Sequence, residues 1–161
     1  MPLIINRERV QDSWVLVSPE DGADFIEQAS GHELLLVPFE YIEAADALSP
    51  KQLGVQVTGD VEVGQIVPWL SKLSLIAIEF PVFRDGRGFS LARQLRRVGY
   101  TGELRAVGDV GRDRLGYLER CGFNAFLIAD EIYSDEALHA FSEISVHYQG
   151  CADDPRPIYH Q

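Results

Sequence analysis

The residues best suited to chemistry form one short glycine- and arginine-rich segment of the sequence. Gly86 and Gly88 permit positive φ and a close approach of the backbone to a ligand. Arg84 and Arg87 carry planar, forked guanidinium groups, which match the geometry of oxyanions. Ser90 is placed to cap a helix, whose N-terminal N–H groups attract negative charge. Together these residues predict a cradle for sulfate, sulfite or phosphate, although they form neither a Walker loop nor a dinucleotide-binding loop.

A structural turn is the alternative explanation of the same segment. Asp85 lies between its two arginines, so it is able to pair with Arg84 or Arg87 in a tight strand-to-helix turn without any ligand. The sequence leaves both interpretations open. We extend the candidate anion site to further polar residues that are expected nearby. The full candidate set is Arg84, Asp85, Gly86, Arg87, Gly88, Ser90, Arg93, Arg105, Asp109 and Arg112.

The charge of the chain is distributed unevenly. The 161 residues carry a net charge of -11, yet nine arginines and only five acids lie between residues 84 and 120. The rest of the chain contains five bases and twenty acids. A basic island in an acidic protein attracts small anions, whereas its surroundings repel the phosphate backbone, so we expect no nucleic-acid binding. Ordinary helix surfaces that carry arginine would produce the same imbalance.

Carboxylates near the ends of three successive predicted strands indicate a second kind of chemistry. Glu79 and Asp85, then Asp109, then Asp130 stand where a sheet or barrel could hold Mg²⁺, which binds oxygen ligands. The alternative assigns Asp109 to a helix N-cap and makes Glu79 a candidate partner of Arg105 on the adjoining strand. No ligand set stands out, so we predict no resident metal and no cofactor.

The positions of these residues depend on strands that alternate with helices. Apolar runs predict the strands, and apolar residues at helical spacing predict the helices. Pro68 is expected to kink one helix, Ser90 and Ser134 to cap two others, and Gly99 and Gly122 to end helices. The expected strands cover 34–37, 54–57, 75–80, 103–107 and 125–129. The expected helices cover 41–48, 63–73 and 90–98, and a further one opens at Asp109 or Gly111 and is stopped by Gly122. A last helix after Ser134 turns residues 137, 138, 141 and 144 inward.

This alternation defines the expected fold class. It indicates an α/β fold with a mostly parallel open sheet of βα repeats, right-handed crossovers and helices on its faces. A complete barrel needs about 250 residues, so a doubly wound, flavodoxin-like sheet is favoured over a partial barrel-like one. The runs 3–5 and 14–17 predict an N-terminal β-hairpin or edge strand, and Ser18 to Asp21 a helix start. We expect one domain over 1–149 and a polar C-terminal tail over 150–161.

The composition indicates a soluble protein of the reducing cytoplasm. Its apolar stretches fall far short of the roughly 20 residues that span a bilayer, so no membrane association is expected. Cys121 and Cys151 lack the spacing of a disulfide framework, a zinc site or an iron–sulfur cluster. Without a cluster or a flavin or nicotinamide loop, the chain is not expected to carry electrons by itself.

Three motifs occur in order between Phe80 and Phe123. They are FP-x-F-x-DGRG-x-S-x-AR-x-LR, GELRA-x-GDV and RCGF. In these motifs and their spacing the chain closely resembles the bacterial family catalogued as domain of unknown function 934. The close match covers about a third of the chain, and Gly111, Arg114 and Asn124 depart from the family pattern.

The resemblance implies a pathway without naming a reaction. Family members are often labelled oxidoreductases and accompany assimilatory sulfite reductase. The leading hypothesis is therefore a cytoplasmic accessory protein of assimilatory sulfite or sulfate reduction, which binds a small oxyanion at the Arg84–Ser90 loop or docks to sulfite reductase through its acidic surface. One alternative is a Mg-dependent enzyme that acts on a small anionic substrate at the strand ends. Another is a non-catalytic protein-interaction module.

Overall fold

The structure, a computed structural model, describes residues 1–18, 24–152 and 154–160. Within these residues the chain forms an α/β fold built on one sheet of eight strands. The strands are β1 (Leu3–Ile5), β2 (Glu8–Val10), β3 (Val15–Leu16), β4 (Leu34–Pro38), β5 (Gln52–Thr58), β6 (Leu73–Phe80), β7 (Glu103–Gly108) and β8 (Ala125–Leu127). Their order across the sheet is β2-β1-β8-β7-β6-β5-β4-β3.

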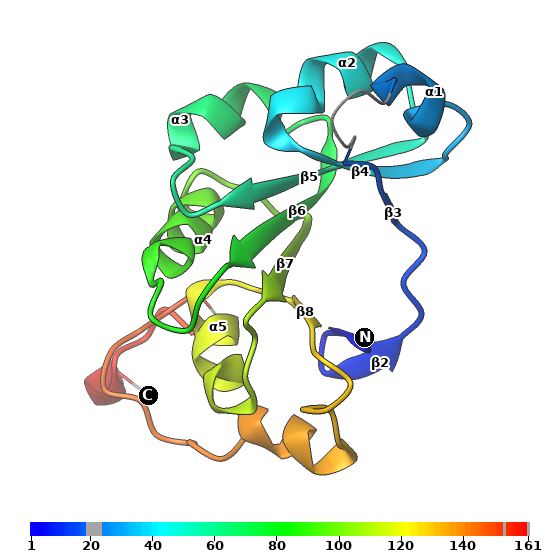
Figure 1. Ribbon diagram of the computed structural model, residues 1–161. Helices are drawn as coiled ribbons and strands as arrows, with labels where there is room; N and C mark the ends of the chain where they lie inside the picture. The colour runs from blue at the N-terminus through cyan, green and yellow to red at the C-terminus, as the bar shows by residue number, and fades with distance from the viewer. Residues whose placement is uncertain (19–23, 153, 161) are drawn as a thin grey trace.

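The central strands are parallel and follow the order of the sequence. From β3 to β8 each strand pairs in parallel with the next, whereas β1 runs antiparallel to β8 and β2 antiparallel to β1. The sheet curls into an open half-barrel (Figure 1). The predicted α/β class and mostly parallel sheet are confirmed, in the barrel-like form. The preference for a doubly wound sheet is wrong, because such a sheet reverses its strand order at a switch point and this one does not.

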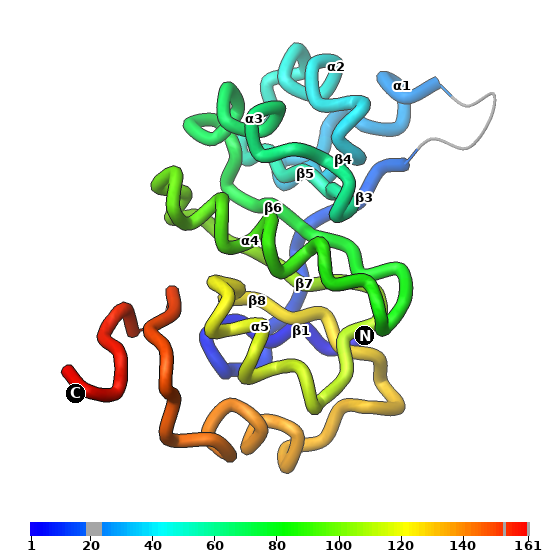
Figure 2. Tube along the Cα trace, turned by 90° about the vertical axis from the view of Figure 1, so that its left-hand side faces the viewer, coloured from blue at the N-terminus to red at the C-terminus, as the bar shows by residue number. Residues whose placement is uncertain are grey.

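The helices between β3 and β8 join successive strands and cover one face of the sheet (Figure 2). Helix residues contribute to the main core on one face and none belongs to the buried cluster on the other, so the predicted cover on both faces is not found in the described part of the chain. Gly99 and Gly122, with φ of +93° and +116°, end α4 and α5 as predicted. The helices are α1 (Phe25–Ala29), η1 (Phe39–Tyr41), α2 (Ile42–Ala47), α3 (Val63–Ile66), η2 (Val67–Trp69), α4 (Arg87–Arg97), η3 (Arg112–Arg114), α5 (Leu115–Cys121), η4 (Asp135–Phe141) and η5 (Ile158–His160).

Two further helix predictions meet different outcomes. Pro68 interrupts its helix as expected, because α3 stops at Ile66 and the chain continues as the 3₁₀ turn η2. The Ser134 hydroxyl caps the last helix by accepting the Ala137 N–H at 3.1 Å. That helix is nevertheless a 3₁₀ helix, and Ile144, predicted to point inward, is 67% exposed because η4 ends before it.

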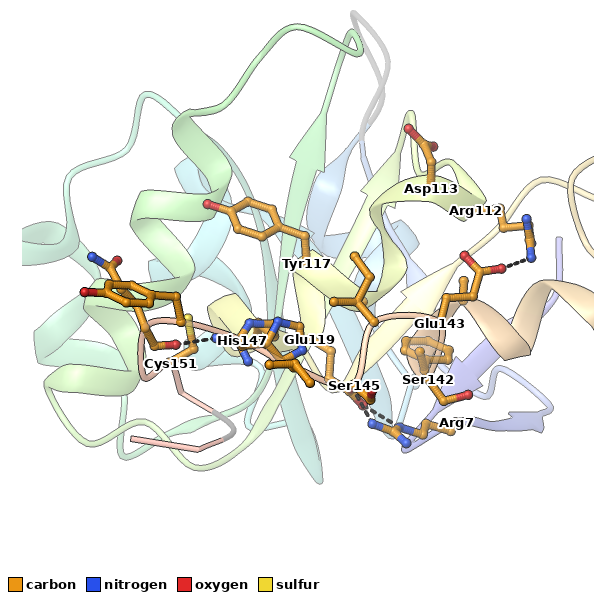
Figure 3. A pocket seen from close by; sticks show the side chains of 18 residues that line it. Arg7, Arg112, Asp113, Tyr117, Glu119, Ser142, Glu143, Ser145, His147 and Cys151 are labelled. Atoms are coloured by element: carbon orange, nitrogen blue, oxygen red, sulfur yellow. Dashed lines mark hydrogen bonds and ion pairs between the residues drawn. The ribbon is translucent and has the colours of Figure 1, made fainter. Parts of the chain in front are cut away.

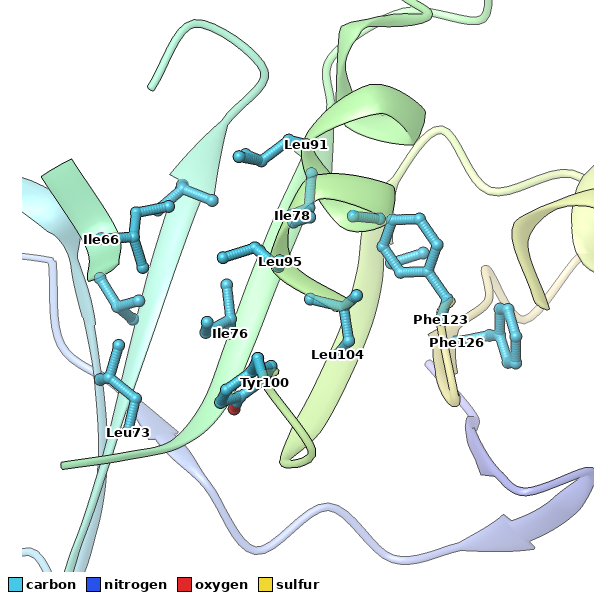
Figure 4. Close-up of a cluster of buried hydrophobic side chains, with 14 of the residues drawn as sticks. Ile66, Leu73, Ile76, Ile78, Leu91, Leu95, Tyr100, Leu104, Phe123 and Phe126 are labelled. Atoms are coloured by element: carbon cyan, nitrogen blue, oxygen red, sulfur yellow. The ribbon is translucent and has the colours of Figure 1, made fainter. Parts of the chain in front are cut away.

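The main core fills the space between the sheet and its helices (Figure 4). Ile76 and Ile78 of β6 pack with Leu95 of α4 and with Phe123, which follows α5. These side chains are at most 2% exposed. Because side chains alternate between the two faces of a strand, Leu75 points to the opposite, concave face.

A segment between β2 and β3 crosses the concave face that the helices leave open (Figure 1). Trp14 packs on Gly54, where an added Cβ would come within 3.0 Å of the indole ring. Asp12 accepts a hydrogen bond from Nη1 of Arg105 at 2.8 Å. The segment 11–14 thus lies across the sheet and covers part of its concave face.

The chain begins with a β-hairpin, and the run 14–17 supplies an edge strand, but the runs 3–5 and 14–17 do not pair with each other. β1 pairs with β2, while the run 14–17 supplies β3 at the opposite edge of the sheet. Of the helix start predicted over Ser18 to Asp21, residues 19–21 lie outside the described residues. The first described helix, α1, is capped by Asp24, whose side chain accepts the Ile26 N–H at 2.9 Å. Among the described helices, none has the length and apolar character needed to cross a bilayer.

Candidate functional site

The Arg84–Ser90 segment follows β6 at the carboxyl edge of the sheet, where the parallel strands end. Arg87 donates from Nε to Oδ1 of Asp85 at 3.0 Å and from Nη2 to Oδ2 at 2.7 Å. It also pairs with Asp60 in the loop after β5. The Arg87 guanidinium lowers the pKa of the Asp85 carboxyl to about 2. We call Asp60, Asp85 and Arg87 the Arg87 cluster. The positive charge of Arg87 is paired there with two carboxylates of the same chain.

The same carboxylate begins α4. Oδ1 of Asp85 accepts the backbone N–H of Arg87 at 3.1 Å, and it stands where an oxyanion would bind a helix N-terminus. The helix starts at Arg87 with Gly86 as its N-cap, so the cap predicted at Ser90 is wrong. Ser90 lies within α4 because Asp85 already satisfies the first N–H upstream.

Two glycines allow close packing at this edge. A Cβ at Gly88 would lie 2.8 Å from the ring of Phe80, so glycine lets the start of α4 rest directly on β6. Gly108 ends β7 with φ of +86°, and a Cβ there would collide with the carbonyl oxygen of Phe80. That oxygen accepts the Asp109 N–H at 2.8 Å. The backbone at the carboxyl edge is tightly held.

A second arginine fills the carboxyl edge beneath the loop. Arg114 is 7% exposed, and its guanidinium carbon lies 4.8, 5.0 and 5.3 Å from the ring centroids of Phe80, Phe89 and Phe83. Its Nη1 donates to the carbonyl oxygen of Asp109 at 3.0 Å. Sequence reasoning did not place Arg114 in the site. The available signal was an arginine at a helix start together with three phenylalanines in the first motif.

Above Arg114 the rim presents aromatic and apolar side chains to solvent. Val82, Phe83 and Tyr117 are 49%, 63% and 58% exposed, and we refer to them as the aromatic patch. Phe83 rests on Arg114, while the Tyr117 ring lies 5.0 Å from that of Phe89. Arg84, next to Phe83, forms no hydrogen bond or ion pair with another residue that the structure describes.

Of the remaining candidate residues, Asp109 lies at the carboxyl edge beside the loop, whereas Arg93, Arg105 and Arg112 lie elsewhere. Arg93 lies in the second half of α4, and Asp109 is exposed after β7. Arg112 pairs with Glu143 of the C-terminal segment. Arg105 is 2% exposed on the concave face. The ten residues therefore do not form one cluster.

Arg105 has different partners from the one predicted. Its Nε donates to Glu103 at 2.7 Å and its Nη1 to Asp12 at 2.8 Å. Glu79, the predicted partner, instead accepts a hydrogen bond from Gln56 at 3.0 Å. A segment that crosses the sheet supplies Asp12, and no local pattern shows such a contact.

The strand-end carboxylates do not converge on one point. Asp85 is held by Arg87, Glu79 by Gln56, and Asp130 pairs with the N-terminal amine at 2.9 Å. In residues 1–18, 24–152 and 154–160, no three His, Cys, Asp or Glu side chains come close enough to hold a metal ion.

Two cavities of similar size lie beside α5. The first, about 660 Å³, lies between α5 and the segment after η4. Figure 3 shows the Arg112–Glu143 pair at one end of this cavity and Cys151 at the other. The second, about 650 Å³, lies between the C-terminal halves of α4 and α5 and is lined by Arg93, Arg96 and Arg97.

Fold and site define a class of protein: an α/β half-barrel whose carboxyl edge is organised by a paired arginine, a buried arginine and an exposed aromatic patch. Residues 54–159 match the model of the family described as bacterial protein of unknown function (DUF934). The chain belongs to this family, as its three motifs predicted. No curated protein matches the sequence.

Proposed function

We propose that the protein is a non-catalytic accessory protein of assimilatory sulfite reduction, which docks onto sulfite reductase through the aromatic patch. The observation that carries the proposal is Phe83, which is 63% exposed yet supported from below by buried Arg114. Aromatic residues held in one orientation dominate the binding energy of many protein interfaces. The family resemblance supplies the partner, because members of the family accompany assimilatory sulfite reductase.

The charges of the loop favour docking over ligand capture at Arg87. The Arg87 guanidinium is bound by two carboxylates, and Asp85 takes the place of an anion at the start of α4. Arg84 remains available beside Phe83, and arginine is enriched at interfaces. The partner surface is expected to present an apolar pocket for Phe83 with a carboxylate at its rim.

A binding measurement with purified sulfite reductase tests the docking surface. Phe83→Ser is expected to weaken the complex by tenfold or more, as loss of an interface anchor does. Tyr159→Ser is the matched control, because Tyr159 is a 72% exposed aromatic outside the patch. Equal affinity of Phe83→Ser and the unchanged protein would exclude the patch, and no binding by the unchanged protein would exclude the partner.

A growth experiment tests the pathway separately. Cells that lack the gene should grow poorly on sulfate or sulfite as sole sulfur source and normally on sulfide. The unchanged gene and Tyr159→Ser should restore growth, whereas Phe83→Ser should not. Equal growth of the deletion strain on all three sources would remove the assignment to sulfite reduction.

A further inference from the structure

One buried side-chain polar atom has no hydrogen-bond partner in the described part of the chain. Nη1 of Arg93, on α4, is shielded from solvent and donates to no acceptor. Buried donors are nearly always hydrogen-bonded, because an unbonded one loses its hydration without compensation. No hydrogen bond or ion pair of Arg93 with a described residue is found, so the charge of this guanidinium is not compensated by the described part of the chain.

Arg93 lines the second cavity, between the C-terminal halves of α4 and α5. The volume of about 650 Å³ falls within the range of small-molecule sites. Arg96 and Arg97 share the lining with the exposed residue Thr101 and with Asn124. The cavity thus combines three guanidinium groups with neutral polar side chains.

The positive charge of this cavity has no carboxylate partner among the described residues. Arg96 donates from Nε to the carbonyl oxygen of Gly122 at 2.8 Å and from Nη1 to that of Tyr100 at 2.8 Å, so its hydrogen bonds are met by neutral groups. Burial lowers the pKa of Arg96, as expected for a charge without a counter-ion. Arg97 is exposed and forms no hydrogen bond or ion pair with a described residue.

The spacing of Arg93 and Arg97 adds to this imbalance. Residues four apart on a helix are neighbours, and two like charges there repel each other. Glu119, the acid in the lining, is bound in a bidentate pair by Arg7 at 2.9 and 2.7 Å. Arg93 and Arg97 therefore place two positive charges at a cavity whose carboxylate, Glu119, is already paired with Arg7.

The first cavity provides an internal comparison. Its volume of about 660 Å³ is nearly the same, and it is also lined by arginines. Arg112 pairs there with the carboxylate of Glu143, and Arg7 pairs with that of Glu119. Size alone therefore does not distinguish the two cavities, whereas the unpaired charge does.

We propose that the second cavity is a binding site for a small, doubly charged oxyanion of the sulfate, sulfite or phosphate type. Arg93 and Arg97 donate to its oxygens through charge-assisted hydrogen bonds, and the Thr101 hydroxyl contributes a neutral donor. Arg96, fixed by backbone carbonyls, adds positive charge. The proposal does not depend on the docking function, since no residue of the aromatic patch lines this cavity.

Titration by two-dimensional ¹H–¹⁵N NMR tests the site. Sodium sulfate, sulfite and phosphate are added in separate arms at constant ionic strength, with sodium chloride as the reference. At least one oxyanion should shift the amide signals of Thr101, Gly122 and Asn124 in a saturable way, and chloride should not. The arm with the lowest Kd identifies the oxyanion among the three sources.

Matched variants locate the binding. Arg93→Gln and Arg97→Gln should each raise the Kd by tenfold or more, whereas Arg84→Gln, which alters an unpaired arginine outside the cavity, should leave it unchanged. If Arg93→Gln does not fold, exposed Arg97 still carries the test. No saturable shift with any of the three oxyanions, or unchanged affinity in Arg97→Gln, would overturn the proposal. Loss of binding in Phe83→Ser would point instead to the aromatic patch.

Discussion

Arg87 at the start of α4 differs from Arg93 and Arg97 in its second half in whether the guanidinium has a partner among the described residues. At its start, Arg87 is bound by Asp85 and Asp60, so that its charge and hydrogen bonds are met within the chain. In its second half, Arg93 and Arg97 have no acceptor among the described residues, and one guanidinium nitrogen is buried without a bond. The first motif supplies Arg87 and Arg93, and Arg97 directly follows its last residue.

This difference separates a structural role from a binding role within the same helix. An arginine that is already paired stabilises the loop but binds an added anion weakly, because that anion must first displace a carboxylate. An unpaired cation beside a cavity has the opposite properties. The glycine- and arginine-rich loop, which attracts attention first in the sequence, therefore organises the carboxyl edge, while unmet charge lies further along the helix.

The largest expected effect comes from a comparison of two glycines, Gly108 at the end of β7 and Gly99 after the end of α4. Gly108 and Gly99 have similar positive φ values of +86° and +93°, but a Cβ at Gly108 would strike the Phe80 carbonyl whereas at Gly99 it would meet nothing within 4 Å. Gly108→Ala should lower the free energy of unfolding by about 3 kcal/mol or more, from backbone strain and overpacking together. Gly99→Ala should cost about 1 kcal/mol from strain alone. Denaturant unfolding measures both, and equal losses would contradict a tighter carboxyl edge.

Replacing Arg114 and Arg93 by methionine tests the comparison at the level of charge. Arg114→Met removes three cation–π contacts and a hydrogen bond, and it should lower the free energy of unfolding by about 2–3 kcal/mol. Arg93→Met removes an unbonded donor, and in chloride buffer it should raise that free energy by about 1 kcal/mol. Melting curves in buffer free of sulfate and phosphate measure the two variants side by side. A comparable loss in both would show that Arg93 has an acceptor within the chain.

Much of the fold could be predicted because its signals are local. The apolar run that became β6 and the glycine that ended α4 act within a few residues of themselves. The strand order is different, since whether β4 lies next to β5 or across a switch point depends on how whole βα units pack. Trp14 shows the same limit: its apolar run was visible, but its place on Gly54 across the sheet was not.

The candidate site was predicted in part for the same reason. Pairing of Asp85 with Arg87 was one of two open readings of neighbouring residues, and the structure contains that pair. Asp60 could not be found, because it enters from the loop after β5 through the fold. Arg93 was grouped with the loop by proximity in sequence, yet its unbonded nitrogen becomes visible only once α5 and the cavity are in place.

The smallest expected effect concerns acid stability of the Arg87 cluster. The pKa of Asp85 is lowered from 3.8 to about 2 because Arg87 hydrogen-bonds its ionised form. A lowered folded-state pKa stabilises the fold above the unfolded pKa, and this stabilisation is lost as the pH falls from about 4 to about 2. Asp85→Asn should therefore be less stable than the unchanged protein at pH 6, with the difference shrinking toward pH 2. Unfolding curves across this range measure it.

A second Asp-x-Arg pair provides the control for this last effect. Asp154 accepts from the Arg156 side chain at 3.0 and 2.8 Å, and its pKa is likewise lowered to about 2. Asp154 belongs to the C-terminal segment and caps no helix of the half-barrel, so Asp154→Asn should change global unfolding less than Asp85→Asn at pH 6. If the two variants behave alike, the Asp85 pair acts only as a local surface ion pair. If only Asp85→Asn loses stability in a pH-dependent way, the pairing of Asp85 with Arg87 stabilises the carboxyl edge as a whole. Arg93 and Arg97 at the second cavity have no such stabilising pair among the described residues.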